Sequence, residues 1–132
     1  MNRLKGNITN LNSFEGLTLL EIETPHGIFN SIIIQNSNES IFSIGVTVEL
    51  MFKETALIIS KNETNLISLQ NQFDCEVISI KKGNLLSQIK LKHNSLKLNA
   101  IITSHCLEKI NLHPGNQVIA MVNTNEIMVS TC

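Results

Sequence analysis

The chain has 132 residues, of which 42% are hydrophobic, and it carries a formal net charge of −1 at pH 7. A charge so close to zero argues against general binding to nucleic acid, which requires an excess of Lys and Arg. No apolar run approaches the ~20 residues of a membrane-spanning helix. The polar start Met1–Gly6 also lacks the pattern of a secretion signal. We therefore expect a soluble, globular protein of the cytoplasm.

The first half of the chain is predicted to form strands separated by turn residues. Alternating apolar and polar residues are typical of a strand with one buried face, and the run Ile32–Ile34 suggests burial on both faces. In the short helical turn that follows, Ile41 and Ile44 are expected to point inward. The predicted elements are, in order, strands at Leu4–Asn12, Leu17–Thr24 and Ile28–Gln35, the helical turn at Asn36–Ser43, and strands at Val46–Phe52 and Thr55–Ser60.

The second half repeats the same order of elements, so the chain contains two copies of one unit. A shift of 69 positions places Asn2 on Asn71, and after one added residue in a turn, a shift of 70 places Met51 on Met121. Insertions cost least in turns, so a single slip at that point fits a true duplication. The predicted elements are strands at Phe73–Ile80, Leu86–His93 and Leu96–Thr103, a short helix at Ser104–Ile110, and strands at Gln117–Val122 and Glu126–Ser130.

Five short strands with a helix between the third and the fourth are the element order of an OB-like barrel. The predicted fold is therefore all-β, with two tandem OB-like five-stranded barrels that each carry one short helix. We place the first barrel at residues 1–62 and the second at 63–132. A unit of this size buries only ~60% of its unfolded surface. The two copies are therefore expected to share a core, to associate between chains, or both.

No catalytic or metal-binding pattern is present in the sequence. There is no Gly-rich phosphate loop, no GxSxG and no HExxH, and adjacent residues such as His105 and Cys106 point to different faces of a helix. The three cysteines form no CxxC and are expected to be small buried thiols. The absence of Trp and Tyr also disfavours stacking of nucleotide bases on a barrel face. We therefore expect a protein that is not an enzyme and does not bind nucleic acid directly.

Charge differs between the two copies. Residues 1–66 have a net charge of −3 and residues 67–132 a net charge of +2. In the second strand of the unit, Glu21 and Glu23 fall on Lys90 and Lys92. If these faces meet, within one chain or between chains, charge would make each copy prefer the other over itself. The alternative is that both are solvated strand faces.

A set of short motifs, in the same order in both halves, resembles the molbindin or Mop domain family, which is TOBE-like. The resemblance covers nearly the whole chain twice, which implies a di-Mop protein. It rests on Asn2-Arg3-Leu4-Lys5-Gly6 and Phe52-Lys53-Glu54-Thr55 in the first copy, and on Ser68-Leu69-Gln70-Asn71-Gln72-Phe73, Ala100-Ile101-Ile102-Thr103, Leu112-His113-Pro114-Gly115 and Val122-Asn123-Thr124-Asn125-Glu126-Ile127 in the second.

The family binds molybdate and tungstate, so the resemblance implies an oxyanion as the bound ligand. Such a dianion only accepts hydrogen bonds, and a site for it needs convergent donors. Carried over by position, the implied oxyanion-binding residues are Asn2, Ser37, Lys53, Ser68, Asn71, Thr103 and Asn123. The sequence departs from the family in having Gln70 in place of Arg and Asn123 in place of Lys. For each polar residue, the alternative is a side chain bonded to its own backbone.

The resemblance also implies a homo-oligomer with sites at its interfaces, a trimer or a dimer, that stores molybdate or maintains its level. The alternative is the ligand-sensing and oligomerisation module of a molybdate-responsive transcription regulator. A barrel that serves only as an interaction module is a further possibility.

Overall fold

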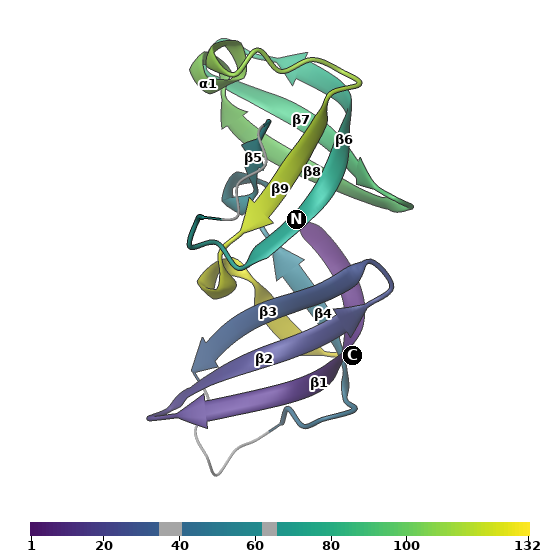
Figure 1. Ribbon diagram of the computed structural model, residues 1–132, viewed down its shortest axis with the longest axis vertical. Helices are drawn as coiled ribbons and strands as arrows, with labels where there is room; N and C mark the ends of the chain where they lie inside the picture. Colours follow the sequence, from purple (N-terminus) through teal and green to yellow (C-terminus); the bar gives the residue numbers. More distant parts are fainter. Residues whose placement is uncertain (35–40, 62–65) are drawn as a thin grey trace.

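The computed structural model describes residues 1–34, 41–61 and 66–132. They form two five-stranded antiparallel sheets, one in each half of the elongated molecule (Figure 1). The strands are β1 (Asn2–Phe14), β2 (Leu17–Thr24), β3 (Gly27–Ile34), β4 (Thr47–Phe52), β5 (Ile58–Ser60), β6 (Asn71–Lys82), β7 (Leu86–His93), β8 (Leu96–Thr103), β9 (Gln117–Val122) and β10 (Met128–Thr131). The helical elements are α1 (Ser104–Lys109) and two 3-10 turns, η1 (Glu54–Ala56) and η2 (Thr124–Glu126).

The alternating sequence pattern produces sheets with one buried and one open face. In β2, Leu20 and Ile22 are completely buried, whereas Glu23 on the opposite face is exposed. The equivalent strand β7 buries Ile89 and Leu91 in the same way. The predicted fold class, all-β with two OB-like barrels in tandem, is confirmed.

The two sheets exchange their last strands, which the sequence did not predict. The strand order is β10-β4-β1-β2-β3 in the first sheet and β5-β9-β6-β7-β8 in the second. Met128 of β10 pairs with Met51 of β4, and the equivalent Ile58 of β5 pairs with Met121 of β9. Figure 1 shows β10 beside β4 and β5 beside β9. The predicted boundary between residues 62 and 63 stays a prediction about the repeat, because each half supplies a strand to the other sheet.

The buried side chains form one hydrophobic cluster that contains residues of both halves. Phe52 and Leu57 flank the crossing from β4 to β5, and Val122 and Ile127 flank the equivalent crossing from β9 to β10; all four are at most 2% exposed. Burial of apolar surface contributes roughly 25 cal/mol per Å², so an interior that is continuous through both halves supplies stability that one short unit lacks. The expectation of a shared core is therefore confirmed.

Several local expectations are wrong or lie outside the described residues. Ile41 and Ile44 are 65% and 66% exposed, and it is Phe42 between them that is buried. The larger apolar side chain therefore takes the inward position. Residues 36–40 of the predicted first helix lie outside the described residues, and residues 41–43 are not helical. Ile34 is 89% exposed because it ends β3 at the margin of the sheet.

Two further expectations from the sequence need correction. Of the cysteines, Cys75 is buried as expected, but Cys106 and Cys132 are exposed. The predicted strand at Thr55–Ser60 begins only at Ile58, because the 3-10 turn η1 occupies its first residues. This turn and the equivalent η2 carry the chain from one sheet into the other.

Candidate functional site

The predicted binding residue Asn71 begins β6 at the junction of the two barrels and is 2% exposed. Its side-chain oxygen accepts a hydrogen bond from the backbone nitrogen of Asn30 at 2.7 Å. Its side-chain nitrogen donates to the carbonyl oxygens of Asn30 and Val122 at 2.8 and 3.1 Å. The amide of Asn71 therefore binds β3 of the other half and β9 of its own half at once.

Asn2, the equivalent residue in the first copy, is held in the same way. It is 4% exposed, and its side chain donates to the carbonyl oxygen of Asn99 at 2.9 Å and accepts from the backbone nitrogen of Asn99 at 2.8 Å. Asn99 is the residue equivalent to Asn30, so the two contacts are copies of each other. A buried amide bonded to backbone groups holds the two barrels in register.

Three other predicted residues also lie near the junction, but they are exposed. Lys53 and Asn123 are equivalent positions directly after β4 and β9, where they precede η1 and η2. The side chain of Asn123 accepts a hydrogen bond from the backbone nitrogen of Thr124 at 2.9 Å. Ser68 is exposed just before Asn71. Within the described parts of the chain, Lys53 and Ser68 have no side-chain hydrogen bond or ion pair.

Thr103 lies at the end of β8, away from the junction. It caps α1, where its hydroxyl accepts a hydrogen bond from the backbone nitrogen of Cys106 at 3.1 Å. Asn99, which binds Asn2, lies four residues earlier on the same strand, so an extended strand puts ~13 Å between them. Ser37 lies outside the described residues. One chain therefore brings Asn2, Asn71, Lys53, Asn123 and Ser68 to the junction but not Thr103.

Further residues, which the sequence did not predict, also lie at the junction. His93 at the end of β7 has both ring nitrogens next to carbonyl oxygens, that of Asp74 at 2.5 Å and that of His26 in the first half at 3.1 Å. The Phe73 ring packs between His93 and Phe29, with ring centroids 5.9 and 5.3 Å apart. The histidines occupy different places in the two units, so the repeat gave no signal for this contact.

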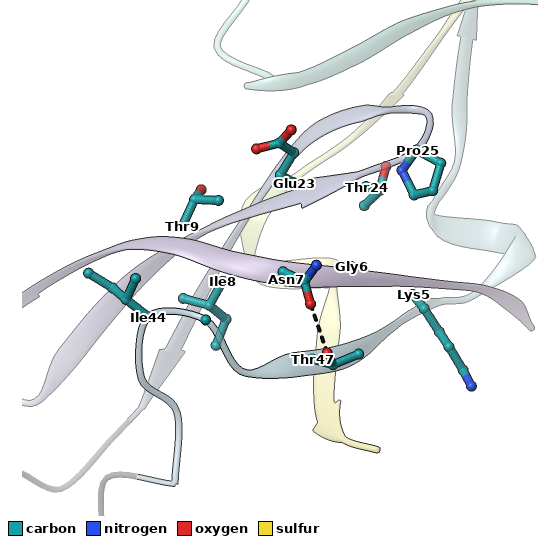
Figure 2. A pocket seen from close by; sticks show the side chains of 11 residues that line it. Lys5, Gly6, Asn7, Ile8, Thr9, Glu23, Thr24, Pro25, Ile44 and Thr47 are labelled. Carbon is teal, nitrogen blue, oxygen red and sulfur yellow. Dashed lines mark hydrogen bonds between the residues drawn. The ribbon is translucent and has the colours of Figure 1, made fainter.

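Two equivalent grooves lie elsewhere, on the barrels themselves. The larger, about 860 Å³, is lined among others by Lys5, Asn7, Glu23 and Thr47, with Asn7 and Thr47 joined by a hydrogen bond of 2.8 Å (Figure 2). Its counterpart, about 420 Å³, is lined by Asp74, Cys75, Glu76, Lys92, His93, Asn94 and Gln117. Both contain carboxylates, which repel a dianion. Of the six predicted residues that the structure describes, none lines either groove.

Comparison with known proteins identifies the family. Residues 67–129 match the model of the TOBE domain. A molybdate-binding protein from Sporomusa ovata is 32% identical in sequence, over 43% of this chain and 85% of that protein, with a TM-score of 0.43. Residues 67–129, in the second half of the chain, belong to the TOBE domain family. The resemblance of the sequence motifs to the Mop domain is thus confirmed.

The whole chain, both halves included, closely matches a solved structure. This is the cytoplasmic molybdate-binding protein ModG in a crystal form with molybdate bound, with a TM-score of 0.92 over 99% of this chain and 96% of ModG. At 16% identity, the match establishes the tandem fold. Among curated proteins, none matches the sequence significantly.

The described residues include no helix of the length and apolar character needed to cross a membrane. They also contain no group of three or more His, Cys, Asp or Glu side chains placed to hold a metal ion.

Proposed function

We propose that this TOBE protein binds molybdate or tungstate in the cytoplasm, without catalysis, at interfaces of a homo-oligomer. The observation that carries the proposal is the tandem arrangement of two TOBE units, which matches 96% of the molybdate-binding protein ModG. That coverage supports a role in storage or homeostasis of molybdenum over the sensor module of a regulator. We expect no direct contact of this chain with nucleic acid.

The proposed donors are the predicted residues that remain exposed in the structure. Molybdate is a dianion whose oxygens only accept hydrogen bonds, and an exposed ammonium, hydroxyl or amide group can donate to it. Lys53, Ser68, Asn123 and Thr103 carry such groups at the surface. Asn2 and Asn71 have their side-chain amides bonded to backbone. Their proposed contribution is to fix the backbone beside Lys53 and Asn123.

A site that unites these donors requires a second subunit. Thr103 lies at the α1 end of its barrel, whereas Lys53, Ser68 and Asn123 lie near the junction. A second copy that places its Thr103 beside the junction of the first would complete a ring of donors. This geometry supports sites at subunit interfaces.

Calorimetric titration of one purified sample with molybdate, tungstate and sulfate tests the proposal, together with its mass in solution. Binding of molybdate and tungstate without heat from sulfate is the expected result, in a species of at least two chains. The variant Lys53→Ala should bind more weakly, and Lys81→Ala, which changes an exposed lysine outside the site, should bind like the wild type. Absence of heat with all three anions would overturn the proposal.

A further inference from the structure

A basic face lies on the outer side of the second barrel. Lys90 and Lys92 extend from β7, and Lys97 of β8 stands directly opposite Lys92 in the antiparallel pair. All three are exposed, and with Ile78 they border a groove of about 510 Å³. Like charges placed directly opposite each other destabilise a strand pair. The basic face therefore gains stability from any anionic surface that covers it.

The charges of this basic face are not neutralised within the described part of the chain. The ion pairs there join Met1 to Glu54, Arg3 to Glu49 and Lys82 to Glu108, and none of them includes Lys90, Lys92 or Lys97. Glu76 stands opposite Lys92 across the β6–β7 pair, but no ion pair joins the two side chains.

An acidic face occupies the same place on the first barrel. Glu21 and Glu23 extend from β2, and their partners on β1 are the uncharged Asn10 and Asn7. Glu21 accepts a hydrogen bond from the hydroxyl of Thr9 at 3.0 Å. In Figure 2, Glu23 and Thr9 point to the same side of the strands.

The two faces match position by position with opposite charge. Glu21 pairs with Asn30 across β2 and β3, as Lys90 pairs with Asn99 across β7 and β8. Glu23 pairs with Ile28 as Lys92 pairs with Lys97. Each face also exposes one isoleucine, with Ile28 59% exposed on the acidic face and Ile78 45% exposed on the basic face. Each face thus repels its own kind and attracts the other.

We propose that the acidic face of one chain docks on the basic face of a second copy of the chain. No ion pair joins the two faces within the described chain, so the complementary surface comes from another copy. The contact is heterologous, with barrel one of one subunit against barrel two of the next, and charge sets the order of assembly. This proposal deepens the assembly part of the proposed function, and its test does not depend on a bound anion.

Charge reversal, read out as mass in solution without ligand, tests the contact. We expect Lys90→Glu with Lys92→Glu to weaken association at least about tenfold, because like-charge juxtaposition costs several kcal/mol. Glu21→Lys with Glu23→Lys should weaken it equally. The chain with all four changes should recover the wild-type mass. The control Lys81→Glu with Lys109→Glu makes the same change in net charge outside both faces and should assemble like the wild type.

Other outcomes would overturn the contact. A wild-type chain that is monomeric in solution would contradict it. So would a chain with all four reversals that does not regain association, and so would double reversals that weaken association no more than the control does. If the lysine variant fails to fold by circular dichroism, the glutamate variant supplies the same test from the other face. Calorimetry with molybdate separates the two proposals. Loss of anion heat in the lysine variant with unchanged mass would make the basic face an anion site and overturn the docking contact.

Salt dependence gives an independent measurement. Between 0.1 M and 1 M salt the Debye length falls from about 10 Å to about 3 Å. The wild-type assembly should dissociate more readily over this range, and association that is insensitive to salt would contradict a contact ordered by charge.

Discussion

Asn2 and Asn99 exchange two hydrogen bonds across the junction of the barrels, although 97 positions separate them in the sequence. Asn71 and Asn30 repeat this contact in the other half. The same side chain that the sequence motif offers as a ligand thus holds the two repeats together.

Replacement of Asn71 by Ala should destabilise the protein strongly. The change removes three hydrogen bonds at a buried site and leaves backbone groups of Asn30 unpaired, at a cost of about 1–3 kcal/mol for each unsatisfied group. Urea unfolding should show a loss of roughly 2–4 kcal/mol. The control is Asn123→Ala, an exposed capping residue, for which about 0.5–1 kcal/mol is expected. Equal stability of the two variants would contradict the structural role of Asn71.

Ser31 and Ala100 offer a matched pair of substitutions. Ser31 is completely buried and donates to the carbonyl oxygen of Ile127 at 2.7 Å, while the second copy has Ala100 at the equivalent position. Ser31→Ala should therefore cost about 1 kcal/mol of unfolding free energy. Ala100→Ser should cost less, because by the symmetry of the repeat we expect its hydroxyl to donate to the carbonyl of Leu57, the residue equivalent to Ile127. Thermal and urea unfolding of both variants measure the two losses, and a larger loss of unfolding free energy in Ala100→Ser than in Ser31→Ala would contradict this expectation.

Deletion of β10 should loosen the first sheet rather than the second. Without residues 128–132, β4 loses one of its two neighbours and keeps only β1, whereas β9 keeps its pairing with both β5 and β6. Hydrogen exchange followed by mass spectrometry should then show faster exchange in Thr47–Phe52 than in Gln117–Val122. Deletion of Cys132 alone, which lies beyond the strand, serves as the control. Faster exchange confined to β9 would contradict the strand exchange.

The second copy lacks the ammonium group that Lys53 gives the first copy, and adding one there should strengthen the binding of molybdate. Asn123 occupies the position equivalent to Lys53, so Asn123→Lys would give both copies an ammonium group at this point. Charge-assisted hydrogen bonds to an oxyanion are roughly twice as strong as neutral ones. We expect molybdate affinity to rise about tenfold in calorimetry, and Asn123→Gln, which adds length without charge, to leave affinity close to wild type. An unchanged affinity in Asn123→Lys would place the site elsewhere.

Cys75 should respond to pH differently from the other two cysteines. Burial, with the nearby charge of Asp74, raises the pKa of its thiol from 9.0 to about 12. Between these values the unfolded chain has lost the proton and the folded chain retains it, so the unfolding free energy falls as pH rises above 9.0. Below that pH the thiol contributes no slope. In Cys75→Ala this part of the decline should be absent from urea unfolding curves.

Thiol labelling provides a second measurement on the same residue. Cys106 and Cys132 are exposed and should react with Ellman's reagent in the native protein, whereas buried Cys75 should react only after unfolding. Rapid reaction of all three thiols in the native state would contradict the burial of Cys75.

The sequence predicts the strands well and their pairing only in part. Strands β2, β7, β8 and β9 have the predicted bounds, because alternation and turn residues mark both ends of each. The exchange of β5 and β10 carries no such mark. The two strands are equivalent in the repeat and pair in the same register, Met128 with Met51 and Ile58 with Met121, so the sequence of each is compatible with either sheet. The chain crosses from one sheet to the other at the 3-10 turns η1 and η2, and these turns are too short to show a periodicity in the sequence.

The candidate site was predictable to a similar degree. The repeat placed Asn2 on Asn71 and Lys53 on Asn123, and the structure brings these positions to one junction. Their role as ligands stays a prediction. A motif indicates only that a polar residue stands at a given position. The tertiary fold shows in addition that the side chains of Asn71 and Asn2 are already hydrogen-bonded to backbone groups 41 and 97 positions away.

The exchanged strands also constrain how the two repeats can evolve after duplication. A substitution of Val129 changes the strand pair with Leu50 in the first sheet, and a substitution of Ile59 changes the pair with Ala120 in the second. Each gene segment therefore encodes part of its neighbour's barrel, and neither repeat can drift freely in its last strand. The outer faces do not take part in this exchange within one chain. Mutation could give them opposite charge while the interior remained a compromise between both copies.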